Sequence, residues 1–423
     1  MTQYPIGKSS LSLSAISVAL CLFASTGAAQ SSEPEGSGGV RFSGFGTLGV
    51  VHSEAPEGWG FLRHNDQPSS THKTRFDTDS QVGIQLNYAA SSKIELVGQL
   101  LATRREARAP LADAIEWAFA AYRPTADLTL RVGRLNLDQF VLSDYRNVGF
   151  AYLYARPPVE FYGSIPSNLD GLDATRVWGF NESRWRAKGF VGRSKINGIP
   201  LTGTLGASLS RESDGLLLRA GWMRAKLARN ASGLTTLLNG LDTVRALPVR
   251  TVAAQADDLH RYLDLAAKPL TYVTLGMTYE QGAWQTAAEV ARISLGDTNV
   301  KAGYASIGRR IGDVSLFGVV SGSTSGRSAV ATPAWGTSLA PVIGPAAAQQ
   351  AQTLGAIAAN TASRSTRQTT YSLGGRWDIH PRLALKVQLD HVKIRAHGGF
   401  LWSNATSDPG SANIATAMLD FVF

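Results

Sequence analysis

The feature of this chain that most constrains its fold is a repeated alternation of polar and apolar residues. Residues 81–88 read QVGIQLNY and residues 127–133 read DLTLRVG, and neither run breaks the alternation. A period of two indicates a β-strand with one apolar and one polar face. The chain is therefore expected to be built from strands whose two faces meet different surroundings.

About sixteen segments have this pattern, and most are 9–14 residues long. Strands of soluble proteins average about 5–6 residues, whereas a tilted strand that crosses a membrane needs about 9–11. The expected strands span 41–53, 77–89, 92–103, 115–123, 127–135, 172–181, 184–193, 201–211, 214–226, 268–281, 283–293, 300–311, 313–322, 366–378, 382–394 and 412–423.

The connections between these strands alternate between short and long. Tight turns occur near residues 90, 125, 182, 212, 312 and 380, and the long connections are 54–76, 104–114, 136–171, 227–267, 323–365 and 395–411. This parity is typical of a transmembrane barrel, which has turns at one end and loops at the other. We therefore predict an all-β fold, a closed antiparallel barrel of about sixteen strands, with both termini at the turn end. The residues predicted to face lipid include Val82, Ile84, Leu86, Leu128, Leu130 and Val132.

The composition fits a barrel better than a bundle of membrane helices. Mean hydropathy is -0.05, and the chain after residue 30 has no run of 18 apolar residues. A barrel tolerates this value because only every second strand residue faces lipid. The last six residues, MLDFVF, end on Phe423, which resembles the assembly signal of bacterial outer-membrane proteins.

The first 29 residues are expected to be a signal peptide. Lys8 precedes an apolar run over 11–24, and the small residues Gly27 and Ala29 suit cleavage before Gln30. A membrane anchor is the alternative, but the run is shorter than the roughly 20 residues that span a bilayer. Residues 30–423 are then one barrel domain. The one Cys, Cys21, lies in the signal, so the mature chain has neither a disulfide framework nor a Cys-based metal site.

No motif indicates catalysis. The chain has no HExxH, GxSxG or P-loop sequence, and its seven His are scattered without the spacing of metal ligands. We therefore expect no enzyme activity, no metal and no cofactor. The sequence pI of about 9.7 allows nucleic-acid binding, but the Arg residues are spread over many strands instead of forming one stripe, so no nucleic-acid partner is expected.

The long segment 136–171 is too rich in aromatic residues for an exposed loop. It is expected to fold inward against the barrel wall. Its aromatic residues are Phe140, Tyr145, Phe150, Tyr152, Tyr154, Phe161 and Tyr162, and its charged residues are Asp138, Asp144, Arg146, Arg156, Glu160 and Asp170.

With this segment the chain resembles the trimeric general porins of Gram-negative outer membranes, a sixteen-stranded family. The matching residues are the Gly133-Arg134 pair that ends the fifth strand and the sequence PVEFYG over 158–163, a loose version of the family's Pro-Glu-Phe-Gly-Gly. The resemblance implies a constriction loop after the fifth strand and a homotrimer. It also implies that Arg156, Glu160 and Arg176 border the narrowest point, together with Asp144 and Arg146 of the loop.

Two interpretations of Arg156 and Glu160 stay open at this stage, a local ion pair that fixes the loop or direct contact with solute. By alternation, the expected lumen cations are Arg131, Arg184, Arg186, Lys188, Arg219, Arg376 and Lys386. The expected lumen acids are Glu95, Glu116, Glu280, Glu289, Asp390 and Asp420. The two sets nearly balance, so no strong field is expected from the wall alone. The net positive charge of the chain, together with Arg146 and Arg156 of the loop, predicts a weak preference for anions.

The leading functional prediction is a water-filled channel in the outer membrane for passive diffusion of small hydrophilic solutes and ions, with outer-membrane lipids around it. The alternative is a substrate-specific channel for phosphate-like or carboxylate-like anions, because Arg side chains suit oxyanions. Segments 227–267 and 338–362 have apolar residues at helical spacing. They are expected to be partly helical and to serve as lids, as subunit clasps or as unordered loops.

Overall fold

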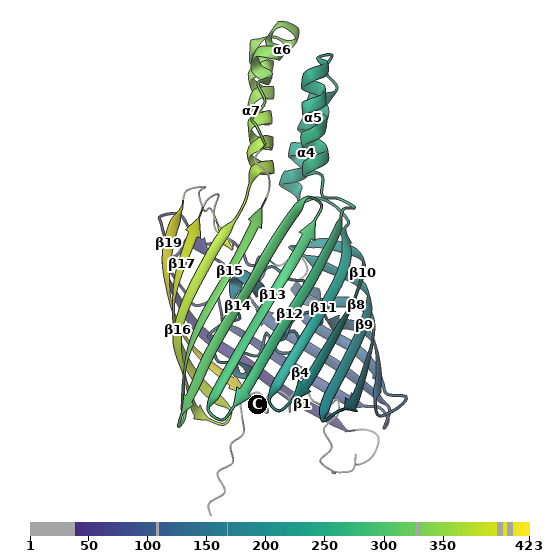
Figure 1. Ribbon diagram of the computed structural model, residues 1–423, viewed down its shortest axis with the longest axis vertical. Coiled ribbons are helices and arrows are strands. Elements are labelled where there is room, and N and C mark those ends of the chain that lie inside the picture. The colour runs from purple at the N-terminus through teal and green to yellow at the C-terminus, as the bar shows by residue number, and fades with distance from the viewer. Residues whose placement is uncertain (1–38, 107–109, 167, 327–329, 396–400, 404–408) are drawn as a thin grey trace, which may run out of the picture.

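The computed structural model describes residues 39–106, 110–166, 168–326, 330–395, 401–403 and 409–423; the predicted signal peptide lies outside them. Sixteen long strands form a closed antiparallel barrel (Figure 1), in which β1 pairs with both β19 and β4. The predicted fold class is thus confirmed. The strands are β1 (Val40–Glu54), β4 (Gln81–Ala89), β5 (Ile94–Thr103), β6 (Ile115–Tyr122), β7 (Leu128–Asn136), β8 (Asn168–Phe180), β9 (Ser183–Ile196), β10 (Ile199–Ser213), β11 (Leu216–Leu227), β12 (Pro269–Gln281), β13 (Trp284–Leu295), β14 (Thr298–Ile311), β15 (Val314–Gly326), β16 (Arg367–His380), β17 (Leu383–Arg395) and β19 (Gly410–Val422).

The predicted alternation sets the two faces of the wall. In β4, Val82, Ile84 and Leu86 are exposed, while Gln81 and Gln85, which alternate with them, are buried. Leu130 and Val132 of β7 are also exposed, and Leu128 is partly exposed. The outer face is therefore apolar and the inner face polar, as a barrel surrounded by lipid requires.

The two ends of the barrel differ, and we call them the turn end and the loop end. The C-terminus lies at the turn end, opposite the helices that rise from the loop end (Figure 1). Two connections at the loop end are also tight. Asn197 and Gly198 join β9 to β10 with φ of 53° and 65°, which is the geometry of a type I′ hairpin turn. Gly296 and Asp297 join β13 to β14.

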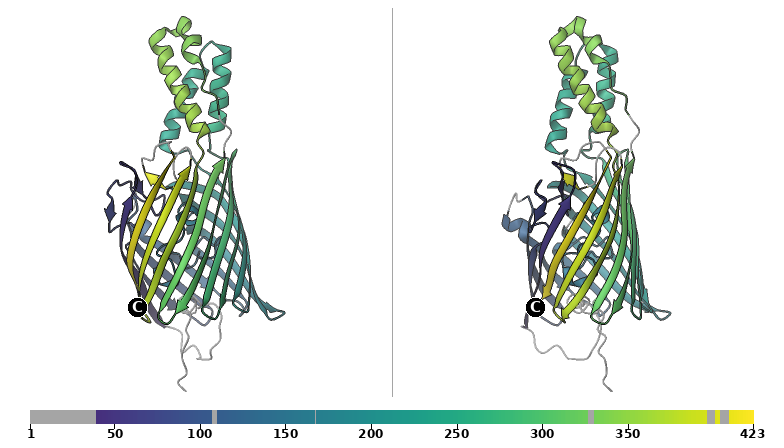
Figure 2. Two further views of the ribbon diagram at one scale, coloured as in Figure 1. Left: turned by 60° about the vertical axis from the view of Figure 1, so that its left-hand side comes forward. Right: turned by 90° about the vertical axis from the view of Figure 1, so that its left-hand side faces the viewer.

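Two helical hairpins stand on the loop end and pack together (Figure 2). They are α4 (Ser232–Arg245) with α5 (Arg250–Leu263), and α6 (Trp335–Ile343) with α7 (Pro345–Ser363). Leu241, Ala256 and Trp335 are among the buried residues of a shared apolar cluster, and Trp335 Nε1 donates a hydrogen bond to Gln255 Oε1 at 2.9 Å. The helical spacing read from the sequence is thus confirmed, and the four helices form one bundle.

Smaller elements complete the loop end. The two-residue strands β2 (Gly60–Phe61) and β18 (Trp402–Ser403) pair with each other, and β3 (Thr74–Arg75) pairs with β1. A short helix, α2 (Pro110–Ala114), precedes β6. Within the described residues, every helix is too short or too polar to cross a membrane.

Candidate functional site

The segment between β7 and β8 has an aromatic core of its own. It contains the 3-10 turn η1 (Gly149–Ala151) and the helical turn α3 (Val159–Tyr162). The rings of Phe140 and Phe161 pack edge to face with centroids 5.2 Å apart, and Phe161 contacts Tyr304 of β14 at 5.6 Å. Edge-to-face ring contacts of this kind stabilise a fixed arrangement. We call residues 137–166 the central segment.

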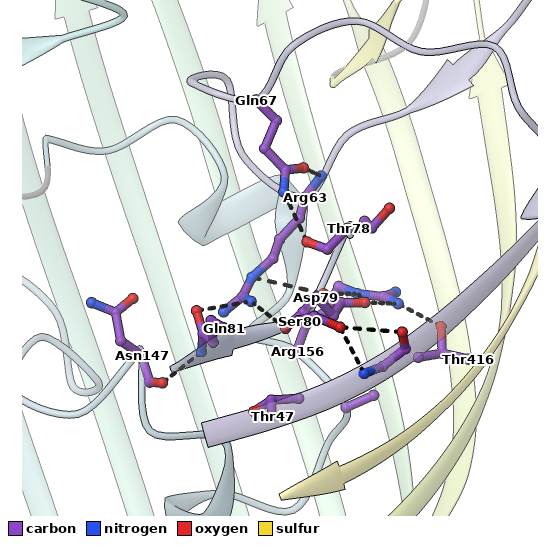
Figure 3. Close-up of polar contacts among 12 residues, drawn as sticks. Thr47, Arg63, Gln67, Thr78, Asp79, Ser80, Gln81, Asn147, Arg156 and Thr416 are labelled. Atoms are coloured by element: carbon purple, nitrogen blue, oxygen red, sulfur yellow. Dashed lines mark hydrogen bonds and ion pairs between the residues drawn. The ribbon is translucent and has the colours of Figure 1, made fainter. Parts of the chain in front are cut away.

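Arg156 ties the central segment to three parts of the wall, and Figure 3 shows its contacts with Asp79 and Thr416. Its Nε lies 3.1 Å from both carboxylate oxygens of Asp79, and its Nη1 lies 3.1 Å from Asp390 Oδ2 of β17. Its Nη2 donates to Thr416 Oγ1 of β19 at 2.5 Å. The Arg156 side chain is only 3% exposed. The positive charge of Arg156 is therefore balanced by the carboxylates of Asp79 and Asp390.

Glu160 is held by the neighbouring part of the wall. Its carboxylate accepts hydrogen bonds from Ser321 Oγ of β15 at 2.7 Å, from Gln368 Nε2 of β16 at 2.6 Å and from the Thr370 hydroxyl. The residue is 2% exposed. Among the described residues, Arg156 and Glu160 form no ion pair with each other, and each is satisfied by strand residues instead.

Most of the predicted lumen cations do face inward, but they bind the central segment. Asp138 pairs with Arg219 of β11, with Arg186 of β9 at 3.3 Å and with Lys188 of β9 at 3.5 Å. Burial works to raise the pKa of Asp138, but the surrounding cations Arg219, Lys188 and Arg186 hold it well below its usual range. Asp138 therefore stays ionised and anchors the start of the segment. The sequence marked it only as one of several acids, because the convergence of three strand cations is a property of the folded chain.

Two further wall cations bind backbone carbonyls of the central segment. Arg376 Nη1 donates to the Phe150 carbonyl at 2.7 Å and to that of Tyr152 at 3.1 Å. Lys386 Nζ donates to the Gly149 carbonyl at 2.6 Å and lies 3.0 Å from Asp420. Arg376 of β16 and Lys386 of β17 were predicted to line the lumen. They carry positive charge on the inner face and also hold the central segment in place.

A cavity of about 120 Å³ remains between the start of the central segment and the wall of β4–β9. Arg131 in it is bound to Asp173 by Nε at 2.9 Å and by Nη2 at 2.5 Å. Arg123 pairs with Glu95 at 2.7 Å. The charged residues that line the cavity are Arg123, Arg131, Arg184, Arg186, Glu95 and Asp144. We call this cavity the arginine cavity. Of the cations predicted to line the lumen, Arg131, Arg184 and Arg186 border it.

The other predicted constriction residues fall into two groups. Asp144 lies 3.8 Å from Arg186 and lines the arginine cavity. Arg146 lies 3.4 Å from Glu116 of β6 and is not among the residues that line the cavity. Arg176 does not join them. Its side chain is 67% exposed and pairs with Asp127 at 3.0 Å beside the β6–β7 turn. Asp173 faces inward, and an odd step of three residues along an alternating strand puts Arg176 on the outer face. Its placement at the constriction is therefore wrong.

The fold is similar to those of solved outer-membrane barrels. An anion-selective porin from Comamonas acidovorans aligns with a TM-score of 0.52 at 10% identity, covering 91% of this chain and 100% of that one. OmpT of Vibrio cholerae aligns with a TM-score of 0.49 at 11% identity, covering 92% of this chain and 99% of that one. No protein-family model matches the chain, and no curated protein matches its sequence. The likeness is one of fold.

Proposed function

We propose that this barrel, which has the fold of the general porins, is an outer-membrane channel for passive diffusion of small hydrophilic solutes. A closed sixteen-stranded wall with a polar inner face encloses far more space than its own side chains fill. The turn end then faces the periplasm and the loop end faces outward. The proposal assigns no catalytic role to any residue.

The arginine cavity is the observation that carries the proposal. The central segment binds β15, β16, β17 and β19 through Arg156 and Glu160, so we place the remaining passage on the side of β4–β9. The narrowest point then lies among Arg131, Arg186 and Asp144, with Arg184 nearer the turn end. Arg156 and Glu160 act mainly as anchors of the segment.

A weak anion preference follows from the same lining. Four Arg and two carboxylates border the arginine cavity, although several of them form ion pairs. Charge in a narrow passage between low-dielectric walls acts more strongly than on an open surface. The local excess of Arg therefore outweighs the near balance of the wall as a whole.

Conductance in planar bilayers tests the proposal. The purified protein should give stepwise current in KCl, with a reversal potential across a low-salt gradient that indicates anions. Absence of steps at every voltage would rule out an open channel, and a firm cation preference would rule out the role given to the arginine cavity.

The second candidate is a channel specific for phosphate-like or carboxylate-like anions. It is favoured by the planar guanidinium groups, which bind oxyanions at two points. Current that saturates with phosphate but not with chloride distinguishes it from general diffusion. For either function we propose a homotrimer, following the family resemblance, and the mass of the detergent-solubilised complex by light scattering tests it.

A further inference from the structure

One border of the arginine cavity is apolar. Val97 of β5 and Phe119 of β6 lie directly opposite each other, so both face the inside of the barrel. Trp117 and Ala121 lie two residues to either side of Phe119, on the same face of β6, and all four residues line the cavity. We call Val97, Trp117, Phe119 and Ala121 the inner apolar patch.

The inner apolar patch is largely separate from the cores of the molecule. Val97 and Ala121 are buried, yet they belong to none of the apolar clusters formed by the described residues. Phe119 packs against the cluster of the central segment. Apolar surface that faces a water-filled passage is unfavourable until another apolar group covers it. The patch therefore favours a solute that has an apolar part.

The opposite border of the arginine cavity has two guanidinium groups of β9. Arg186 lies 3.3 Å from Asp138 and 3.8 Å from Asp144, and its side chain is 29% exposed. Both distances are longer than the roughly 2.7–2.9 Å of a charge-assisted hydrogen bond, so Arg186 can still bind a carboxylate. Arg184 also lines the cavity. Opposite it on β8 lies Gly179, where an added Cβ would meet no atom within 4 Å.

A chain of contacts connects these two borders. The Arg131 guanidinium lies over the Phe119 ring, 5.0 Å from its centroid. Arg131 Nη2 donates to Asn136 Oδ1 at 3.0 Å, and Asn136 Nδ2 donates to Asp144. Asp144 in turn is the residue 3.8 Å from Arg186. The inner apolar patch and the guanidinium of Arg186 are therefore only a few side chains apart, which suits a small solute that contacts both.

The wall between the two borders offers hydroxyl groups. Thr129 of β7 and Thr175 of β8 lie directly opposite each other and line the cavity. Among the described residues, neither hydroxyl has a hydrogen-bond partner. A hydroxyl can donate to an oxyanion or accept from a donor. From β6 to β9 the cavity thus changes from apolar to hydroxylated to cationic.

The volume of the arginine cavity limits the size of the solute. The cavity measures about 120 Å³, and an apolar cavity of about 150 Å³ holds one benzene molecule. A solute with a single ring therefore matches it. Rings pack favourably on the aromatic side chains of Trp117 and Phe119, and a planar carboxylate matches the planar guanidinium groups of the opposite border.

We propose that the arginine cavity binds small aromatic carboxylates, solutes with one ring and one carboxylate group. The ring lies against the inner apolar patch, and the carboxylate binds Arg186 and Arg184 beside the hydroxyls of Thr129 and Thr175. The proposal rests on the proposed function, because the solute must enter the channel to reach the cavity. It specifies which carboxylates the anion-specific candidate would favour.

Calorimetric titration of the detergent-purified full chain at pH 7 tests this proposal without requiring ion current. The probe is benzoate. Acetate has the same charge without a ring, cyclohexanecarboxylate has a ring that is not aromatic, and benzamide has the aromatic ring without the charge. Benzoate should bind about tenfold more tightly than acetate or benzamide, a difference of about 1.4 kcal/mol. Cyclohexanecarboxylate should bind less tightly than benzoate.

Two substitutions test the two borders of the cavity separately. Arg186→Gln should weaken benzoate binding about tenfold through loss of a charged donor, and the buried Asp138 keeps Arg219 and Lys188 as partners. Phe119→Leu should weaken it about threefold, because an apolar side chain remains but the ring contact is lost. The matched controls are Arg176→Gln and Phe180→Leu on the outer face of β8, where both side chains are exposed. They should bind benzoate as the unmodified protein does.

Several results would overturn the proposal. Equal affinity for acetate and benzoate would mean a plain anion site, and equal affinity for benzamide and benzoate would remove the role of the guanidinium groups. Cyclohexanecarboxylate binding as tightly as benzoate would exclude selection for an aromatic ring. Losses of the same size in the controls and in the cavity variants would also contradict it. If Arg186→Gln fails to fold, the four probes and Phe119→Leu still decide.

Conductance in KCl, with and without benzoate, is recorded separately. Stepwise current without selective benzoate binding would leave the channel proposal standing and overturn this one. Selective benzoate binding without any current would support the binding site and count against the open channel.

Discussion

Arg156 and Asp79 form a two-point ion pair, with Arg156 Nη2 2.7 Å from Asp79 Oδ2 and Nε 3.1 Å from both oxygens. The pair joins the middle of the central segment to the residue two positions before β4. Both side chains are almost fully buried. Because removal of one partner leaves an uncompensated buried charge, this contact controls how firmly the segment is held.

We expect Arg156→Gln to loosen the central segment. Breaking a buried ion pair costs about 3–5 kcal/mol. Here Asp390 loses Arg156 as its ion-pair partner, and Asp79 keeps only the longer contact with Arg63 at 3.8 Å. Single-channel conductance should rise and become noisier, while ion selectivity changes little. Arg176→Gln on the outer face is the matched control and should leave the trace unchanged. A large loss of anion preference with steady conductance would instead place Arg156 in contact with solute.

Selectivity should respond to the arginine cavity. Arg184→Gln should reduce the anion preference measured as a reversal potential at low salt, because the residue lines the cavity. At about 1 M salt the Debye length falls to about 3 Å, so the variant and the unmodified protein should then agree. Identical reversal potentials at low salt would move the narrowest point away from this cavity.

The outer face should reject charge. Leu130 lies opposite Ala174, in the middle of β8, and Leu130→Arg should lower the free energy of unfolding by roughly 2–4 kcal/mol. Urea unfolding in lipid vesicles measures the loss. Thr129→Arg, one residue away on the inner face, should cost clearly less; the reverse order would mean that the two faces are exchanged.

The contact between the β1–β4 connection and the central segment should weaken in acid. Burial, helped by Arg146 and Arg105 and opposed by Asp66, lowers the pKa of His64 to about 4. The unfolded chain, with a pKa near 6.5, therefore binds the proton more readily. The stabilisation is complete above pH 6.5 and is lost as pH falls toward 4, by up to about 3 kcal/mol.

The protection factor of the neighbouring Asn65 amide in hydrogen exchange, which is corrected for the intrinsic pH dependence of exchange, measures this effect of His64; this amide donates to the Gly163 carbonyl at 2.9 Å. His64→Gln should remove the pH dependence of this protection factor between pH 6.5 and pH 4. A dependence that survives the substitution would assign it to another group.

The helical bundle should unfold independently of the barrel. Leu241 is fully buried in the bundle, and Leu241→Ala should destabilise it by about 2–5 kcal/mol. Limited proteolysis should then cut α4 to α7 faster, with barrel unfolding and conductance unchanged. Thr243→Ala on the exposed face of α4 is the control. If Leu241→Ala abolished conductance as well as unfolding the bundle, the bundle would be shown to support the channel.

The sequence predicted the strands well because one face meets lipid and the other meets polar groups, a contrast that strand alternation records directly. It placed Arg219 and Lys386 on the inner face for the same reason. It failed for Arg176, which was assigned by likeness to a family instead of by parity with Asp173. It also indicated no partners for Arg156 and Glu160, because those partners lie between 77 and 260 positions away in the chain, where no local pattern can indicate them.

The bundle and the central segment have separate apolar cores, one around Leu241 and Trp335 and the other around Phe140 and Phe161. Residues on the outside of α4–α7 can therefore change during evolution without disturbing the packing that shapes the passage. If the loop end faces outward, antibodies and phages meet the bundle first. The chain can thus alter the surface by which it is recognised while solute flow stays constant.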